Sequence, residues 1–280
     1  MNTSSHTRPG KHTDKPTIAL LGEFSAGKST LANVLLGETK SRVRVTATQF
    51  PPIWYVHGTG MPVHVAPDGT ETDMPDGAIE DMSLQDTRVV RVPLQAGILR
   101  HFSLLDMPGS SDPNMSPDIW DALLPMASIV MWCTPATQAW RQSEASIWDR
   151  VPDQVKRRSL LLLTRMDKLV TAGDRSKVIS RVERETAGQF RSVLPVSLLD
   201  ALGPADRQDA SGMPQVIAAL KGILTGSPEP EHAPIARSTG DVPAQGRPAT
   251  RIVPRRVSAR QVTRRSLAGD GPGREGTGHE

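Results

Sequence analysis

The chain has 280 residues, a formal net charge of +3 and a single cysteine. One cysteine excludes a disulfide framework within the chain, and the apolar neighbours of Cys133 place it in a core. No stretch reaches the about 18 apolar residues of a membrane-spanning helix, and residues 1–16 lack the apolar segment of a signal peptide. We therefore expect a cytoplasmic protein, whose membrane contact would be peripheral, at the inner membrane.

From residue 17 onward, short apolar runs alternate with amphipathic stretches. The runs predict strands at 17–22, 53–57, 88–93, 98–106, 128–134, 159–164 and 191–196. The amphipathic stretches predict helices at 28–36, 116–124, 139–151, 175–187 and 213–224. This alternation predicts an α/β fold, a mostly parallel central sheet with helices on both faces.

Two regions interrupt this alternation. Only residues 94–97 connect the predicted strands 88–93 and 98–106, which is too short for a crossover helix, so we expect this pair to form an antiparallel edge hairpin. Residues 58–87 are rich in turn formers and predict a small β-excursion around Val63–Val65.

Composition sets the predicted boundaries of the folded part. Residues 1–16 predict a disordered leader, and residues 17–225 one domain. Residues 226–280 are dense in proline, glycine and arginine and carry too little apolar surface to fold, so they predict a disordered basic tail.

The segment after the first predicted strand has the pattern G-x-x-x-x-G-K-[ST], which indicates a phosphate-binding loop. Its glycines let the backbone wrap a phosphate, and the start of the following helix adds N–H donors. Lys28 would neutralise the β- and γ-phosphates, and the Ser29 hydroxyl would bind Mg²⁺. The predicted nucleotide-binding residues here are Gly22, Glu23, Ser25, Ala26, Gly27, Lys28, Ser29 and Thr30.

Three later motifs lie at the ends of predicted strands. Asp106 would hold Mg²⁺ through water, while the N–H of Gly109 would face the γ-phosphate. In Thr164-Arg165-Met166-Asp167, the carboxylate would accept the N1–H and 2-amino groups of guanine, and Arg165 would lie along the purine face. Ser197 would support the guanine O6.

These four motifs, in this order, resemble the TRAFAC class of P-loop GTPases. The stretch GEFSAGKSTLANVLLG, residues 22–37, is similar to the opening of bacterial dynamin-like GTPases. The resemblance covers roughly residues 17–225, the GTPase domain, and implies a P-loop GTPase fold that hydrolyses GTP to GDP and phosphate with Mg²⁺. It also implies a homodimer through the nucleotide face.

The resemblance implies roles for further residues. Ser25 matches a serine that helps to place the attacking water, and Ser25, Lys28 and Thr46 form the implied catalytic set. The switch I threonine, a third Mg²⁺ ligand beside Ser29 and Asp106, is Thr46 or alternatively Thr48. Phe24 stands where dynamin has glutamine, and no glutamine follows Gly109, so hydrolysis should be slow unless dimerisation or a partner stimulates it.

Several alternatives stay open. The domain can be a nucleotide-gated interaction module with little hydrolysis that acts through a larger dynamin-like or helical partner, because no helical stalk follows Leu224. An ATPase of similar fold is a third reading. The seven arginines from Arg247 to Arg265 can be a solvated tail, or can contact an anionic membrane or an acidic protein. Nucleic acid is disfavoured because no aromatic residues are interleaved.

Overall fold

The computed structural model describes residues 15–37, 51–75, 82, 86–111 and 117–226. All of them belong to the first of two units of the chain, Met1–Glu231, whereas the second unit, His232–Glu280, lies outside the described residues. The domain boundaries expected after residues 16 and 225 stay predictions.

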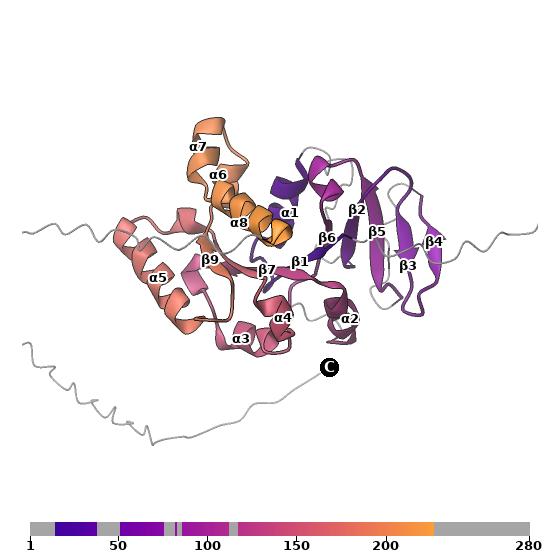
Figure 1. Ribbon diagram of the computed structural model, residues 1–280, viewed down its shortest axis with the longest axis horizontal. Helices are drawn as coiled ribbons and strands as arrows, with labels where there is room; N and C mark the ends of the chain where they lie inside the picture. Colours follow the sequence, from indigo (N-terminus) through magenta and orange to yellow (C-terminus); the bar gives the residue numbers. More distant parts are fainter. Residues whose placement is uncertain (1–14, 38–50, 76–81, 83–85, 112–116, 227–280) are drawn as a thin grey trace, which may run out of the picture. The chain divides into compact units, whose positions relative to one another are not determined.

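A nine-stranded sheet forms the centre of the described part (Figure 1). Its strands run in the order β4-β3-β5-β2-β6-β1-β7-β8-β9. Pairing is parallel at β1–β6, β1–β7, β2–β5, β7–β8 and β8–β9, which confirms the mostly parallel sheet. The strands are β1 (Thr17–Leu21), β2 (Ile53–His57), β3 (Val63–Val65), β4 (Glu71–Asp73), β5 (Val89–Leu94), β6 (Ser103–Asp106), β7 (Ile129–Pro135), β8 (Leu160–Thr164) and β9 (Ser192–Pro195).

The sheet has an antiparallel edge hairpin, but not between the strands expected to form it. The hairpin is β3–β4, in which Val63 pairs with Asp73 across a turn closed by the Ala66 N–H and the Thr70 carbonyl. The expected pairing of 88–93 with 98–106 is wrong, because β2 lies between β5 and β6. Residues 97–100 form a 3₁₀ turn, η3 (Gly97–Arg100), so the connection is long enough to pass over one strand.

Helices cover both faces of the sheet, as predicted (Figure 1). Helices α1 and α8 pack on one face, and α2, α3, α4 and α5 pack on the other. The 3₁₀ turns are η3, η4 (Leu124–Met126), η5 (Ala136–Gln138) and η6 (Met166–Lys168). The helices are α1 (Lys28–Leu36), α2 (Pro117–Leu123), α3 (Gln142–Trp148), α4 (Asp153–Lys156), α5 (Ala172–Glu185), α6 (Leu198–Ala201), α7 (Ala205–Ala210) and α8 (Met213–Thr225).

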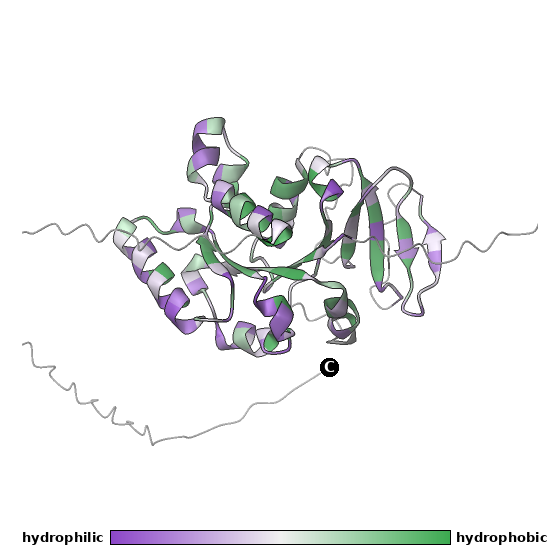
Figure 2. Cartoon of the chain, viewed as in Figure 1, coloured by the Kyte–Doolittle hydropathy of each residue, from purple (hydrophilic) through white to green (hydrophobic). Residues whose placement is uncertain are grey.

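The helix predicted at 139–151 is shorter in the structure. Trp140 has a left-handed backbone with φ 58°, so α3 begins only at Gln142. The central strands are mostly apolar (Figure 2), and every residue of β1 and β8 is buried, as expected for strands covered on both faces. Cys133 is also buried, and burial raises its thiol pKa to about 12, which makes it an inert core residue.

Candidate nucleotide-binding site

The phosphate loop, residues 22–30, joins the end of β1 to the start of α1. Gly27 is the N-cap of α1 and has a left-handed backbone with φ 98°. Lys28 is the first residue of the helix, and Ser29 and Thr30 follow in its first turn. The strand, loop and helix therefore stand in the arrangement that directs backbone N–H groups toward a bound phosphate.

Gly22 is at a position that no other residue can occupy without a shift of the backbone. Its φ is 138°, and a Cβ added there would lie 2.1 Å from the carbonyl oxygen of Cys133 in β7. Ser25 also has a left-handed backbone, with φ 58°. The path of the loop is thus set by close contact with β7 and by positive φ angles at Gly22, Ser25 and Gly27.

Lys28 lies buried at the centre of the loop. Its Nζ donates hydrogen bonds to the carbonyl oxygens of Gly22 at 3.1 Å and Glu23 at 2.8 Å. These bonds hold the ammonium group against the loop backbone. The positive charge of the Lys28 ammonium group would face an anion bound within the loop.

The segment that follows Asp106 is joined to the phosphate loop. Asp106 ends β6 and is in register with Leu20 of β1. The Ser110 N–H donates to the Gly22 carbonyl at 3.1 Å, and the Phe24 N–H donates to Ser111 Oγ at 3.0 Å. A Cβ on Gly109 would lie 2.6 Å from the Phe24 nitrogen, so only glycine allows this approach.

The end of β8 braces the phosphate loop from the other side. The Thr164 hydroxyl donates to the Ala26 carbonyl at 2.7 Å, and Arg165 Nη2 donates to the Ser25 carbonyl at 2.5 Å. Arg165 has a left-handed backbone, with φ 57°. The side chains of Thr164 and Arg165, which the sequence predicts to contact the nucleotide, thus bind the loop that contains Ser25.

Asp167 and Ser197 lie close together, at the ends of β8 and β9. Ser197 Oγ lies 3.4 Å from Asp167 Oδ1, and Lys168 Nζ lies 3.8 Å from the other carboxylate oxygen. Ser197 is buried and caps α6 by accepting the Asp200 N–H at 3.4 Å. The parallel strands β1, β8 and β9 therefore bring the phosphate loop, Asp167 and Ser197 to one edge of the sheet.

Sequence reasoning missed a polar connection between the phosphate loop and α3. The Glu23 carboxylate accepts from Arg141 Nη1 at 3.0 Å and from the Ser143 hydroxyl at 2.6 Å. The Arg141 N–H in turn donates to Glu144 at 3.0 Å. Glu23 lies 118 or more positions from Arg141 and Ser143 in the chain, so no local pattern predicts its contacts with them.

Glu144 is a buried carboxylate that was also missed. It accepts from Trp132 Nε1 at 2.9 Å, from the Thr134 hydroxyl at 2.9 Å, and from the Arg141 N–H. Burial raises the pKa of this carboxyl, although the three hydrogen bonds oppose the shift. The only signal in the sequence is a glutamate three residues after the N-cap residue Arg141, the position that the acidic member of a capping box occupies.

Some predicted site residues lie outside the described residues. They are Thr46, Thr48 and the arginines from Arg247 to Arg265. Within the described ranges, no helix has the length and apolar character needed to cross a bilayer.

The oxygen groups of the site fit Mg²⁺. No cluster of three or more His, Cys, Asp or Glu side chains suited to a metal occurs among the residues that the structure describes. Mg²⁺ does not need such a cluster, because it is commonly held by one or two carboxylates together with substrate phosphates and waters. Asp106 and the exposed Ser29 hydroxyl supply donors of this kind next to the phosphate loop.

The fold and the loop together are those of a P-loop α/β domain. No model of a known protein family matches the sequence, and no curated protein matches it. Among solved structures, the chain is similar to two of an oligomerised bacterial dynamin pair described as sensing and tethering membranes. Their TM-scores are 0.56 and 0.54, with 16% and 17% sequence identity.

Each match to a bacterial dynamin covers 75% of this chain and 35% of the dynamin, so the shared part is about a third of the larger protein. A further match, at TM-score 0.44 and 19% identity, is Era from Aquifex aeolicus bound to GDP and AlF₄⁻, covering 77% of this chain and 57% of that one. The protein has the fold of a dynamin-like GTPase domain, as the sequence predicted.

Proposed function

We propose that this protein binds GTP with Mg²⁺ and hydrolyses it to GDP and phosphate. The observation that carries the proposal is the convergence of the phosphate loop, Asp106, Asp167 and Ser197 at one edge of the sheet. The loop and Lys28 would bind the phosphates, and Asp167 would bind the base. The likeness to the bacterial dynamins supports the fold on which this arrangement rests.

The choice of guanine rests on Asp167. Its carboxylate would accept both the N1–H and the 2-amino group of guanine, whereas adenine offers no such pair of donors. Ser197, 3.4 Å from Asp167, would stand beside the O6 edge of the same base. The hydrogen bond from Arg165 to the Ser25 carbonyl links this residue to the phosphate loop, and its guanidinium would also lie along the purine face.

In hydrolysis, a water attacks the γ-phosphate in line with the leaving oxygen. Lys28 would stabilise negative charge on the transferring phosphate, and the Gly109 N–H would donate to it. Ser25 would orient the attacking water, and Thr46 or Thr48 would face the phosphate from switch I. Ser29, Asp106 (through water) and the switch threonine would hold Mg²⁺, which when bound would supply positive charge next to the phosphates.

Exposed apolar side chains favour a homodimer through the nucleotide face. Phe24 is 57% exposed in the phosphate loop, and Val170 is 89% exposed after η6. Leu199 and Leu202, in and just after α6, are also exposed. These residues follow the C-terminal ends of β1, β8 and β9, at the edge of the sheet that carries the proposed site, where they would contact a second copy of the chain. The bacterial dynamins are likewise described as an oligomerised pair.

The test of the proposal is GTP turnover with Mg²⁺ at low and high protein concentration, together with binding of a non-hydrolysable GTP analogue. We expect saturable binding and a rate per molecule that rises with concentration. Binding without turnover at any concentration would instead support a nucleotide-gated module that acts through a larger dynamin-like or helical partner. Absence of binding would refute both readings.

Contact of Arg247–Arg265 with an anionic membrane stays a prediction, testable by co-sedimentation with anionic vesicles.

Replacing Asp167 with asparagine should transfer the nucleotide preference from GTP to xanthosine triphosphate. The amide presents an N–H donor where guanine needs an acceptor, so affinity for GTP should fall by about a hundredfold. Competition binding with GTP, xanthosine triphosphate and ATP measures the change.

The matched control is Asp153→Asn, whose side chain is 84% exposed at the start of α4. This control should leave the preference unchanged. An unaltered preference for GTP in Asp167→Asn would overturn the assignment of the base, and a preference for ATP in the parent protein would support the ATPase reading.

A further inference from the structure

The phosphate loop carries a negative charge of its own, in the side chain of Glu23. Glu23 is the only acidic residue among residues 22–30, and its side chain is 13% exposed. A carboxylate in this place would repel bound phosphates, and water screens it only in part because little of it is exposed. Binding of phosphate by the loop is therefore favoured by any group that cancels this charge.

The start of α3 supplies the cancelling groups. Arg141 Nη1 donates to one carboxylate oxygen of Glu23 at 3.0 Å, and the Ser143 hydroxyl donates to the other at 2.6 Å. Within the described ranges, Arg141 is the only cation paired with this carboxylate. Charge-assisted hydrogen bonds of this kind are stronger than bonds between neutral groups. The charge of Glu23 is thus balanced from outside the loop.

The backbone of Arg141 is fixed independently of its guanidinium. Its N–H donates to Glu144, which also accepts from the Thr134 hydroxyl of β7. The Trp140 N–H donates to the same hydroxyl at 3.1 Å. The start of α3 is therefore attached to the sheet, and only the side chain of Arg141 reaches across to the loop.

Glu23 also holds the lysine of the loop. Its carbonyl accepts from Lys28 Nζ at 2.8 Å, while its carboxylate binds Arg141. A single residue therefore connects the ammonium group proposed to bind phosphate with the helix start that carries Arg141. A shift of Glu23 would also move the carbonyl that Lys28 contacts.

We propose that Arg141 is a positioning residue for the phosphate loop, which cancels the charge of Glu23 and so lets the loop accept a polyphosphate. Arg141 acts through Glu23 and not by contact with the reacting atoms. The inference rests on the proposed function, because it assigns the phosphates of the nucleotide to this loop. It does not depend on which base is bound.

The test is a double-mutant cycle between Arg141 and Glu23 in the full chain, with a non-hydrolysable GTP analogue and inorganic tripolyphosphate as probes. Arg141→Gln should weaken binding of both probes by about fivefold, as for one uncancelled charge that solvent partly screens. In the Glu23→Gln background, the same change should cost less than about twofold, because no charge remains to be cancelled. An equal loss in both backgrounds would indicate a purely structural role and overturn the proposal.

Salt and a conservative change separate charge from shape. Arg141 is 45% exposed, so the loss in Arg141→Gln should shrink as salt rises from about 0.05 M to about 0.5 M. Arg141→Lys keeps the charge and should retain most of the parent affinity. A loss that is independent of salt, or Arg141→Lys as weak as Arg141→Gln, would contradict the proposal.

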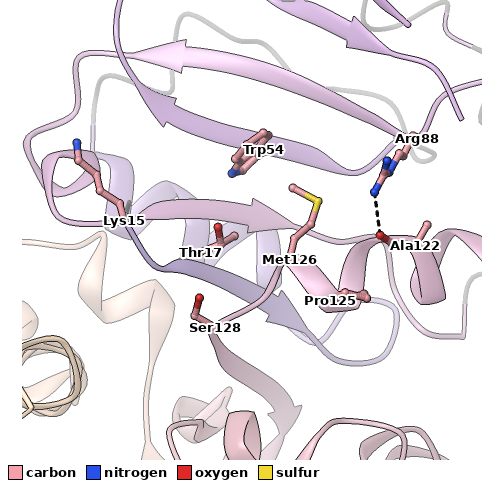
Figure 3. A pocket seen from close by; sticks show the side chains of 8 residues that line it. All are labelled: Lys15, Thr17, Trp54, Arg88, Ala122, Pro125, Met126 and Ser128. Carbon is pink, nitrogen blue, oxygen red and sulfur yellow. Dashed lines mark hydrogen bonds between the residues drawn. The ribbon is translucent and has the colours of Figure 1, made fainter. Parts of the chain in front are cut away.

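Two controls remove a cation elsewhere. Arg150, at the other end of α3, is 46% exposed and paired with Asp121, so Arg150→Gln removes an ion pair of matched exposure. Lys15 precedes β1 beside a pocket at the start of that strand, whereas the phosphate loop follows its end (Figure 3). Arg150→Gln and Lys15→Gln should each leave the affinity unchanged.

The outcomes distinguish failure of this inference from failure of the proposed function. A parent protein that binds neither probe would refute both. If the parent binds tripolyphosphate but not the GTP analogue, the proposed function fails while the cycle still tests Arg141. Binding of both probes without coupling in the cycle refutes only the role of Arg141. If Arg141→Gln does not fold by circular dichroism, Ser143→Ala decides, because it removes the other donor to Glu23 and should show the same coupling.

Discussion

Replacement of Lys28 with alanine is expected to lower kcat/KM for GTP by about a hundredfold or more, the cost of losing a group aimed at developing charge. Lys28 is buried in the phosphate loop, where its ammonium group bonds the carbonyls of Gly22 and Glu23. No other side chain of the loop is cationic, so no neighbour can take over its charge. Steady-state phosphate release measures the effect.

Lys177→Ala is the matched control, because Lys177 is exposed on α5. It should retain the parent rate. Thermal unfolding of Lys28→Ala should show that the domain remains folded. A folded Lys28→Ala protein with the parent rate would exclude the phosphate loop as the site of turnover.

Replacement of Glu144 with alanine is expected to lower the free energy of unfolding by about 3 kcal/mol. The carboxylate accepts hydrogen bonds from Trp132 Nε1, Thr134 Oγ1 and the Arg141 N–H, and alanine leaves these donors without their acceptor. Urea denaturation, followed by tryptophan fluorescence, measures the loss. Glu183→Ala, on the exposed side of α5, is the control and should change stability little.

The loss caused by Glu144→Ala should depend on pH in a defined direction. Burial raises the pKa of Glu144 in the folded protein, so the folded state keeps a proton that the unfolded state has already released. The stability from this proton linkage is fully present below the unfolded pKa and is lost as pH rises through the folded pKa. The difference between parent and variant should therefore be larger at acid pH, and a difference that grows with pH would contradict this account.

Glu144 is linked to Glu23 of the phosphate loop through Arg141, so the stability that Glu144 provides also matters for the site. Arg141 and Ser143, at the start of α3, both bind the Glu23 carboxylate in the phosphate loop. Loss of Glu144 removes the acceptor of the Arg141 N–H. We expect Glu144→Ala to weaken nucleotide binding as well, because it loosens the helix start that holds Glu23.

Much of the site could be predicted because its signals are local. The helix after the phosphate loop was predicted as residues 28–36, which are the bounds of α1, since the glycine-lysine motif fixes its start. The predicted positions of Asp167 and Ser197 depend only on where parallel strands end, and the structure brings them within 3.4 Å. What each residue contributes to nucleotide binding stays a prediction.

The order of the strands could not be predicted in the same way. Apolar periodicity indicates that residues 89–94 and 103–106 are strands, but it does not indicate their neighbours. Leu99 appeared to continue an apolar strand, yet it is buried from within the 3₁₀ turn η3. Glu144 was missed for a related reason, because its donors Trp132 and Thr134 come from β7 and meet it only after the chain has folded.

The position of β2 between β5 and β6 has a consequence for how the protein folds. Ile53 pairs with Val90 on one side and with Asp106 on the other, so neither partner strand has left the ribosome when β2 does. Contacts between residues so far apart in sequence close slowly, because chain entropy is lost before the pairing forms. This half of the sheet should therefore assemble late. Until it does, β6 and β2 present unpaired edges, and the nascent chain is most prone to aggregate at that stage.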